Sequence, residues 1–202
     1  MVKIAVLVSG GGTNLQALID ASARGEIPHG QFALVIASND QAYALKRAEK
    51  AGIPSVVIAR KQYREQKDFD EAIVRTLKEY DIDMVILAGF LSILGKPVID
   101  AYTDRIINVH PALIPSFCGK GFYGLKVHEA ALAKGVKVTG ATVHLVNEIP
   151  DGGKILLQKA VEVKEGDTPE ILQRRVMEEA EWILLPKAAE QLAKEIEENE
   201  RI

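Results

Sequence analysis

The 202-residue sequence contains a single cysteine, Cys118. One cysteine cannot form a disulfide within the chain, and no cysteine or histidine spacing in the sequence is typical of a zinc site. We therefore expect no bound metal. A chain with so little cysteine suits the reducing cytoplasm, which is the location that we predict.

Long apolar runs and an excess of positive charge are also absent. No stretch approaches the roughly 20 uninterrupted apolar residues of a membrane helix, and the first apolar run reaches glycines too early for a signal peptide. The 25 Lys and Arg against 28 Asp and Glu give a net charge of −3, so no broad cationic surface is available for nucleic acid. We expect a protein that binds small molecules, as a monomer or homodimer, and neither membranes nor nucleic acid.

Apolar runs alternate with helical patterns through the first part of the chain. A run that is apolar on both faces, such as 83–90, is typical of a buried parallel strand. Repeated alternation of strands and helices predicts a parallel, doubly wound sheet. The expected strands cover 2–10, 32–40, 54–58 and 83–90, and the expected helices cover 15–22, 43–51 and 68–81.

The second part of the chain follows a different pattern. Pro150–Gly153 lie between two strand-like runs, which we expect to pair in the antiparallel direction. Thr168 and Pro169 are typical of a helix start, and Pro186 is expected to kink or divide the helical C-terminus. Further expected elements are a strand at 106–110, a glycine-rich loop at 116–124, a helix at 125–134 and strands at 136–146 and 153–163. Together the patterns predict one α/β domain over 1–202, with a Rossmann-like, open, mainly parallel twisted sheet, helices on both faces, a late antiparallel strand pair and a helical C-terminus.

A glycine-rich segment from Ser9 to Asn14 joins the first strand to the first helix. At the carboxyl end of a parallel strand, backbone N–H groups freed by glycine and the positive helix end bind anions, phosphate above all. The segment lacks the lysine of a Walker loop, and Leu15 stands where the third glycine of GxGxxG belongs. A small phosphorylated substrate is therefore favoured over a nucleotide, and the alternative is a tight turn without a ligand.

Asn108 and His110 lie two positions apart at the end of a predicted strand, so their side chains share one face. Asp151 lies in the turn between two later strands. An aspartate beside an imidazole stabilises its cation, so we expect Asp151 to raise the pKa of His110. With the Asn108 amide, such a pair could stabilise an oxyanion while a proton moves, as acyl or formyl transfer requires. The alternative is a structural histidine and a simple turn.

Five segments carry a resemblance to a known family. They read SGGGTNLQALID, LAGFLSIL, INVHPALIP, GATVHLV and PDGGKILLQ, in this order. In sequence and separation they are similar to the phosphoribosylglycinamide formyltransferases, which are folate-dependent enzymes, and the resemblance extends from Val2 to about Pro186. It implies transfer of the formyl group of 10-formyltetrahydrofolate to the amine of 5-phosphoribosylglycinamide in de novo purine biosynthesis. The implied products are formylglycinamide ribonucleotide and tetrahydrofolate.

The resemblance also implies roles for individual residues. Asn108, His110 and Asp151 match the family's catalytic residues, with His110 acting as an imidazolium. His144 and Thr142 are expected to support them. The implied contacts of the phosphorylated substrate are Gly11, Gly12, Thr13, Asn14 and Glu181. The implied folate contacts are Gln66, Phe90, Leu91, Ser92, Ile93, Leu94, Asn147, Glu148, Ile149 and Pro150, together with Asn108 and Asp151.

The sequence departs from the family at three positions. Ser92 stands where many relatives have an arginine, Gln66 takes the place of a folate-contacting arginine, and Trp182 replaces a histidine that often follows the glutamate. Two related enzymes are alternatives, one acting on initiator methionyl-tRNA and one hydrolysing the formyl folate, but we expect each to need a further domain. A non-catalytic nucleotide-binding module is the third alternative, and it does not require the three catalytic candidates to converge.

Overall fold

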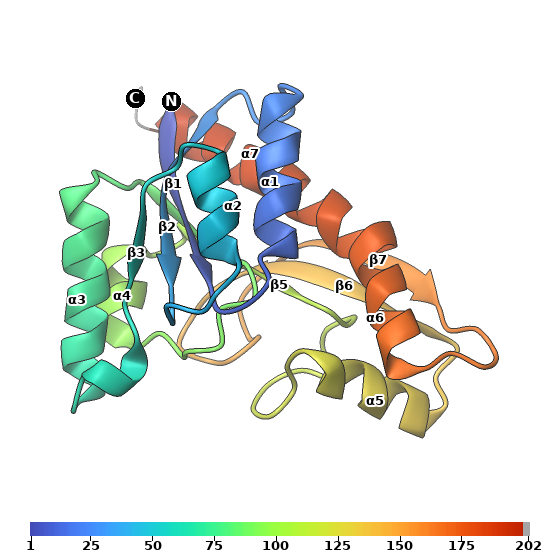
Figure 1. Ribbon diagram of the computed structural model, residues 1–202. Helices are drawn as coiled ribbons and strands as arrows, with labels where there is room; N and C mark the ends of the chain where they lie inside the picture. The colour runs from blue at the N-terminus through green and yellow to red at the C-terminus, as the bar shows by residue number, and fades with distance from the viewer. Residues whose placement is uncertain (200–202) are drawn as a thin grey trace.

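The computed structural model describes residues 1–199, and the end of the domain predicted for 1–202 lies outside the described residues. One seven-stranded sheet, in the order β3-β2-β1-β4-β5-β6-β7, forms the framework (Figure 1). The pairs among β1 to β5 are parallel, whereas β6 pairs antiparallel with both β5 and β7. The predicted α/β class, with a mainly parallel sheet and a late antiparallel pair, is confirmed.

Strands and helices alternate up to β4, as the sequence predicts. The helix predicted at 125–134 begins and ends at those residues, whereas α4 was not predicted because its six residues are too few to show a helical period. The strands are β1 Val2–Val8, β2 Gly30–Ala37, β3 Ser55–Val57, β4 Met84–Leu87, β5 Ile106–His110, β6 Val138–Leu145 and β7 Ile155–Glu162. The helices are α1 Thr13–Ala23, α2 Ala44–Lys50, the 3₁₀ turn Arg60–Gln62, α3 Gln66–Glu79, α4 Lys96–Ala101, α5 Leu125–Lys134, α6 Pro169–Val176, the π-helical turn Met177–Glu181 and α7 Trp182–Asn199.

Helices cover both faces of the sheet. On one face, Ile4 of β1 belongs to a buried cluster with Leu15 of α1 and Leu185 of α7. On the other face, Leu7 of β1 belongs to a cluster with Phe69 of α3. Successive side chains of a strand point to opposite faces, so a strand covered on both faces is apolar throughout. Figure 1 shows α1 and α2 on one side of the sheet and α3 and α4 on the other.

The helical C-terminus is divided upstream of Pro186. As predicted, Thr168 caps α6, and its side chain accepts a hydrogen bond from the Ile171 N–H at 3.3 Å. The π-helical turn Met177–Glu181 separates α6 from α7, and α7 continues through Pro186 to Asn199. Pro186 therefore does not divide the helix, and the predicted alternative, a kink at Pro186, stays a prediction. The proline lies one turn after the π-helical segment, where the backbone hydrogen-bond pattern has already changed.

The carboxyl ends of β1, β4 and β5 meet at one edge of the sheet. Leu7 of β1 is in register with Leu87 of β4, and Leu87 is in register with Asn108 of β5. The segments that follow these strands therefore open on the same edge. Open parallel sheets bind their ligands at this edge.

Candidate active site

β5 ends in two polar residues that share one face of the sheet. Asn108 lies directly opposite His144 of β6, and His110 lies directly opposite Thr142. Side chains directly opposite in an antiparallel pair are neighbours. Strand pairing therefore gathers four polar side chains at the ligand-binding edge of the sheet.

Asp151 enters this group from the connection between β6 and β7. Its Oδ2 lies 3.6 Å from His110 Nδ1, and its Oδ1 lies 3.5 Å from His144 Nε2. The Gly119 N–H donates to Oδ2 at 2.7 Å, which links Asp151 to the glycine-rich loop after β5. The structure thus brings the three predicted catalytic residues together, with His144 in contact with both Asn108 and Asp151.

The imidazole of His144 orients the amide of Asn108. Nδ1–H of His144 donates to the Leu145 carbonyl at 2.8 Å, which leaves Nε2 facing Asn108 and Asp151. The Asn108 Nδ2 group donates one N–H to this atom at 3.2 Å. An amide nitrogen carries two N–H bonds, and the second remains for a ligand. This contact is compatible with the supporting role of His144, which stays a prediction.

Thr142, the second predicted supporting residue, anchors the turn after β5. Its buried hydroxyl donates to the Ala112 carbonyl at 2.7 Å. The same oxygen accepts from the Ile114 N–H at 3.1 Å and from Gln158 Nε2 at 2.9 Å. The bonds to Ala112 and Ile114 fix the backbone that follows His110, and the bond from Gln158 holds the hydroxyl in place.

The ring of His110 is buried and is not the cation that the sequence predicts. The residue is 4% exposed, and its Nε2–H donates to the Phe117 carbonyl at 2.8 Å. Burial lowers the pKa of His110 and outweighs the opposite effects of Asp151 and the Phe117 carbonyl, while His144 lowers the pKa further. Asp151 raises this pKa, as expected, but its charge 3.6 Å away does not offset the removal of the ring from water, so the net shift of the pKa is downward.

Asp151, in contrast, is a fixed negative charge. Burial raises the pKa of its carboxyl group, but the contacts with His144 and the Gly119 N–H, together with the charge of His110, bring the pKa below its ordinary value. At neutral pH the pair therefore consists of an aspartate and a mainly neutral imidazole. A proton that reaches this pair can bind either Asp151 Oδ2 or His110 Nδ1, which lie 3.6 Å apart.

One pocket, of about 120 Å³, adjoins Asn108 and Asp151, and we call it the apolar pocket. Its walls come from the segment after β4 and from the connection between β6 and β7. All the predicted folate contacts except Gln66 and Leu91 line it. The lining residues are Leu87, Phe90, Ser92, Ile93, Leu94, Asn108, His144, Val146, Asn147, Glu148, Ile149, Pro150 and Asp151.

Gln66 and Leu91 hold the wall of the apolar pocket without lining it. Gln66 Nε2 donates to the Ile93 carbonyl at 3.1 Å and to Asp70 Oδ1 at 2.9 Å. The Leu91 N–H donates to Ser9 Oγ at 2.9 Å, and its side chain is exposed. Both residues support the segment after β4 in this structure, and their folate contacts stay predictions.

A second pocket, of about 180 Å³, adjoins the glycine loop Ser9–Asn14, and we call it the glycine pocket. Gly12 adopts a φ of +70°, and a Cβ there would lie 2.7 Å from the Cβ of Ala44, so both conformation and space require glycine. The pocket contains every residue predicted to contact the phosphorylated substrate. Its lining residues are Gly10, Gly11, Gly12, Thr13, Asn14, Ala88, Gly89, Val109, Pro111, Gly124, Gln173, Met177 and Glu181.

Glu181 is a buried carboxyl group in the wall of the glycine pocket. It is 4% exposed and accepts a hydrogen bond from Asn14 Nδ2 at 2.7 Å. Burial raises the pKa of Glu181 to about 7, and the bond from Asn14 opposes this rise. Near neutral pH both protonation states are therefore populated. The neighbouring Glu178 and Glu179 are exposed, so Glu181 differs from the solvated charges of the same acidic stretch.

The two pockets share the end of β5. Asn108 lines the apolar pocket, whereas Val109 and Pro111 line the glycine pocket. Alternate side chains of a strand point to opposite faces, which explains why neighbouring residues serve different pockets. A molecule in either pocket therefore lies beside the strand end that carries His110.

Comparison with known proteins identifies the family. Residues 2–188 match the formyl transferase family. The chain belongs to the formyl transferase family. Glycinamide ribonucleotide transformylase 1 from Symbiobacterium toebii is a similar solved structure, with a TM-score of 0.90 and 42% identity over 96% of this chain and 88% of that chain.

Two sequence relatives differ in how much of their length this formyl transferase spans. Phosphoribosylglycinamide formyltransferase of Haemophilus influenzae is 40% identical over 179 residues, which cover 89% of this chain and 82% of the relative. The trifunctional purine biosynthetic protein adenosine-3 of Homo sapiens is 46% identical over 191 residues, which cover 95% of this chain but 18% of the human protein.

Sequence reasoning missed several pocket residues of this formyl transferase. Gln173 and Met177 reach the glycine pocket from α6 and the π-helical turn. Together with Glu181 they recur at intervals of four residues, so the helical spacing around the predicted Glu181 was the signal that could have found them. Leu87 and Val146, which border the apolar pocket, read as ordinary strand residues.

Residues 1–199 contain neither a metal-binding cluster of side chains nor a helix suited to crossing a membrane. Within that range, no group of three or more His, Cys, Asp and Glu side chains is arranged to hold a metal ion. None of the helices in the same range combines the length and the apolar character that crossing a membrane requires.

Proposed function

We propose that this formyl transferase moves the formyl group of 10-formyltetrahydrofolate to the amine of 5-phosphoribosylglycinamide, as a step of de novo purine biosynthesis. The names of its relatives support this assignment. One observation carries it: an apolar pocket and a pocket of glycine N–H groups share the strand end where Asn108, His110 and Asp151 meet. A non-catalytic nucleotide-binding module has no need of that arrangement.

The glycine pocket receives the phosphorylated acceptor. Backbone N–H groups of the glycine loop and the positive end of α1 bind the phosphate. Asn14 and Glu181 lie in the same pocket and bind the ribose hydroxyls, because a carboxyl group with a pKa of about 7 can accept or donate a hydrogen bond near neutral pH. The amine of the acceptor then extends toward the end of β5.

The apolar pocket receives the folate ring system. Side chains such as Phe90 and Leu94 cover the flat ring, and the polar backbone of 147–151 binds the ring nitrogens and exocyclic groups. The formyl group, which is attached to the folate, lies beside Asn108 and Asp151. The two substrates therefore approach the catalytic residues from the two faces of β5.

Formyl transfer needs a stabilised oxyanion and one proton relay. The amine lone pair attacks the formyl carbon, and the electrons of the C=O bond move to oxygen. The second N–H of Asn108 and the Nε2–H of His110 stabilise this oxygen. To do so, His110 Nε2–H must exchange its hydrogen bond to the Phe117 carbonyl for one to the oxyanion. The negative charge on this oxygen adds to that of Asp151 and raises the pKa of His110. The ring therefore becomes a cation when the intermediate forms.

The proton of the attacking nitrogen completes the reaction. It passes through water to the pair formed by Asp151 and His110. Collapse of the intermediate re-forms the C=O bond and breaks the bond between the formyl carbon and the folate nitrogen. That nitrogen takes up the proton, and tetrahydrofolate leaves. No covalent intermediate with the protein is required.

We also propose that the chain works in the cytoplasm as one catalytic domain, with these two small molecules as its partners and with neither nucleic acid nor metal. The catalytic residues and both pockets lie within one chain. A monomer and a homodimer are therefore both compatible with the proposed activity.

An absorbance assay for tetrahydrofolate release tests the proposal. The purified protein is given 10-formyltetrahydrofolate with 5-phosphoribosylglycinamide, with the same acceptor lacking its phosphate, with initiator methionyl-tRNA, or with no acceptor. We expect turnover with the phosphorylated acceptor and a kcat/KM about a hundredfold lower without the phosphate, because each charge-assisted hydrogen bond contributes about 1.5–3 kcal/mol. Equal use of both small acceptors, transfer to the tRNA alone, or release without any acceptor would overturn the assignment.

A further inference from the structure

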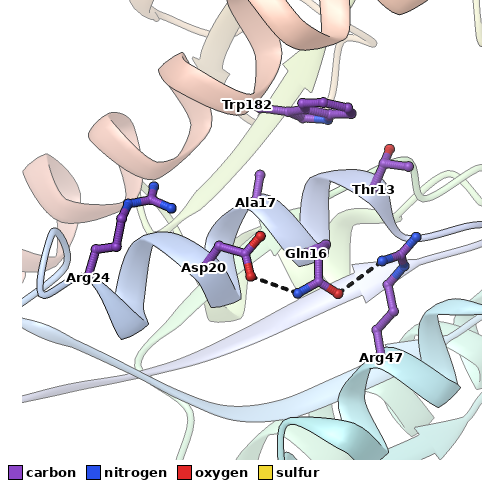
Figure 2. Close-up of a pocket in the computed structure, with 7 residues that line it drawn as sticks. All are labelled: Thr13, Gln16, Ala17, Asp20, Arg24, Arg47 and Trp182. Atoms are coloured by element: carbon purple, nitrogen blue, oxygen red, sulfur yellow. Dashed lines mark hydrogen bonds between the residues drawn. The ribbon is translucent and has the colours of Figure 1, made fainter.

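A line of polar side chains connects α1 and α2 with the glycine loop. Asp20 Oδ1 accepts a hydrogen bond from Gln16 Nε2 at 2.8 Å, and Gln16 Oε1 accepts one from Arg47 Nη1 at 2.9 Å (Figure 2). Arg47 Nε–H donates to the Gly11 carbonyl at 2.8 Å. The guanidinium group therefore bridges a side chain of α1 and the backbone of the loop, and the reaction proposed above makes no use of it.

α2 holds the glycine loop at two successive carbonyl groups. The Ala44 N–H donates to the Gly10 carbonyl at 3.2 Å, and Arg47 takes the next carbonyl, that of Gly11. In a planar trans peptide the C=O and the following N–H point in opposite directions. These bonds therefore turn the N–H groups of Gly11 and Gly12 away from α2.

The same two N–H groups belong to the wall of the glycine pocket. Gly11 and Gly12 line that pocket, and within residues 1–199 neither N–H donates to a protein group. We propose that Arg47 is a positioning residue, which holds the Gly11 carbonyl and so aims the Gly12 N–H at the phosphate of the acceptor. This inference rests on the proposed function, because it takes a phosphorylated molecule as the ligand of the glycine pocket.

Neighbouring groups hold the guanidinium group of Arg47 in place. Its Cζ lies 5.1 Å from the centre of the Tyr43 ring, and the residue is half-buried. Contacts with Gly11, Gln16 and Tyr43 hold the planar group on three sides. Arginine presents its N–H groups in fixed directions, whereas lysine is a point charge on a flexible stem. Orientation of the Gly11 carbonyl therefore depends on the arginine fork and not on charge alone.

The test compares three variants on acceptors with and without the phosphate. Arg47→Met removes the fork and keeps an unbranched side chain, and Arg47→Lys keeps the charge. Lys46→Met is the matched control, because Lys46 Nζ lies 5.8 Å from the same Tyr43 ring and, within residues 1–199, makes no hydrogen bond to the glycine loop. Thermal unfolding of each variant is measured alongside.

We expect Arg47→Met to raise KM for the phosphorylated acceptor about tenfold, with kcat and KM for the formyl donor within about twofold of wild type. Arg47→Lys should lie close to Arg47→Met, and Lys46→Met should match wild type. The acceptor without phosphate should be used equally by all four proteins. Equal losses on both acceptors, or an Arg47→Lys protein that matches wild type, would reject the positioning role.

Binding of ribose 5-phosphate, measured by calorimetry, separates this inference from the proposed function. If the wild-type protein does not transfer a formyl group, the proposed function is rejected. The positioning role still predicts that Arg47→Met weakens ribose 5-phosphate binding about tenfold and leaves ribose binding unchanged. If wild type and Arg47→Met bind ribose 5-phosphate equally, or if wild type does not bind it, the positioning role is rejected whatever the activity.

Discussion

The glycine pocket and the apolar pocket are built in opposite ways. Backbone carbonyls of the glycine loop are bonded to α2, and Ser9 Oγ accepts a hydrogen bond from Ser38 at 2.7 Å, so the loop is fixed by the protein alone. In the apolar pocket, Ile93 is 69% exposed and Ile149 is 66% exposed. Gathered large apolar side chains in contact with water typically mark a binding surface.

The glycine pocket is thus preorganised before a ligand binds, whereas the exposed side chains of the apolar pocket become buried only on binding. Donors that are already aimed at an anion bind it with little ordering cost. An exposed apolar wall contributes only when a ligand covers it. Changes in the glycine pocket should therefore affect folding as well as binding, whereas changes to the exposed side chains of the apolar pocket, Ile93 and Ile149, should affect only the proposed donor binding.

The largest expected effect belongs to the strand end that the pockets share. In the proposed mechanism the His110 ring stabilises the oxyanion, so we expect His110→Ala to lower kcat about 10²- to 10⁴-fold with both KM values within about threefold. The tetrahydrofolate assay measures both parameters. His29→Ala is the control, because His29 contacts Glu190 and lines neither pocket. A His110→Ala protein that retains a tenth of the wild-type kcat would remove the imidazole from the mechanism.

The positions of the catalytic candidates could be predicted, but the charge of His110 could not. Asn108 and His110 follow from the period of two in a strand, and Asp151 follows from the turn between two paired strands. The lowered pKa of His110 depends on burial of the ring, which the bond to the Phe117 carbonyl only partly offsets. Phe117 lies in an irregular loop, so this burial leaves no periodic trace in the sequence.

The fold shows the same limit. α5 has enough residues for its helical period and was predicted to the residue. α4 has six residues, and the π-helical turn Met177–Glu181 has no propensity signal of its own. That turn lies where Glu181 meets Asn14, a contact across 167 positions of sequence. Local sequence patterns therefore predict which helices and strands form, whereas tertiary packing determines where they end.

The next effect concerns folding and tests the buried side of the comparison. The pKa of Glu181 rises from an ordinary 4.5 to about 7 on folding. Between these values the folded protein keeps a proton that the unfolded chain has released, so this group's contribution to stability is full below pH 4.5 and is lost as pH rises through about 7. We expect Glu181→Gln to match wild type near pH 4.5 and to exceed its unfolding free energy by about 3 kcal/mol at pH 8.

Urea unfolding of wild type and Glu181→Gln at several pH values measures this difference. Comparing the two proteins cancels other buried groups such as His128, whose pKa burial lowers to about 4. Glu179→Gln, an exposed neighbour, should follow the wild-type curve. A constant difference across the pH range would show that Glu181 does not hold a proton in the folded state, and the two pockets would then be less different than their burial implies.

The smallest expected effect tests the exposed side of the comparison. The proposed donor site would bury the exposed Ile93 side chain on binding, so Ile93→Ser should weaken donor binding by about 1–2 kcal/mol, or roughly tenfold in KM, and leave stability within about 0.5 kcal/mol. Ile171→Ser is the matched control, because Ile171 is 49% exposed on α6 and lines neither pocket. Donor titrations and urea unfolding give the two quantities separately. A loss of stability without a change in donor KM would show that the wall is part of the core, and the apolar pocket would then be as preformed as the glycine pocket.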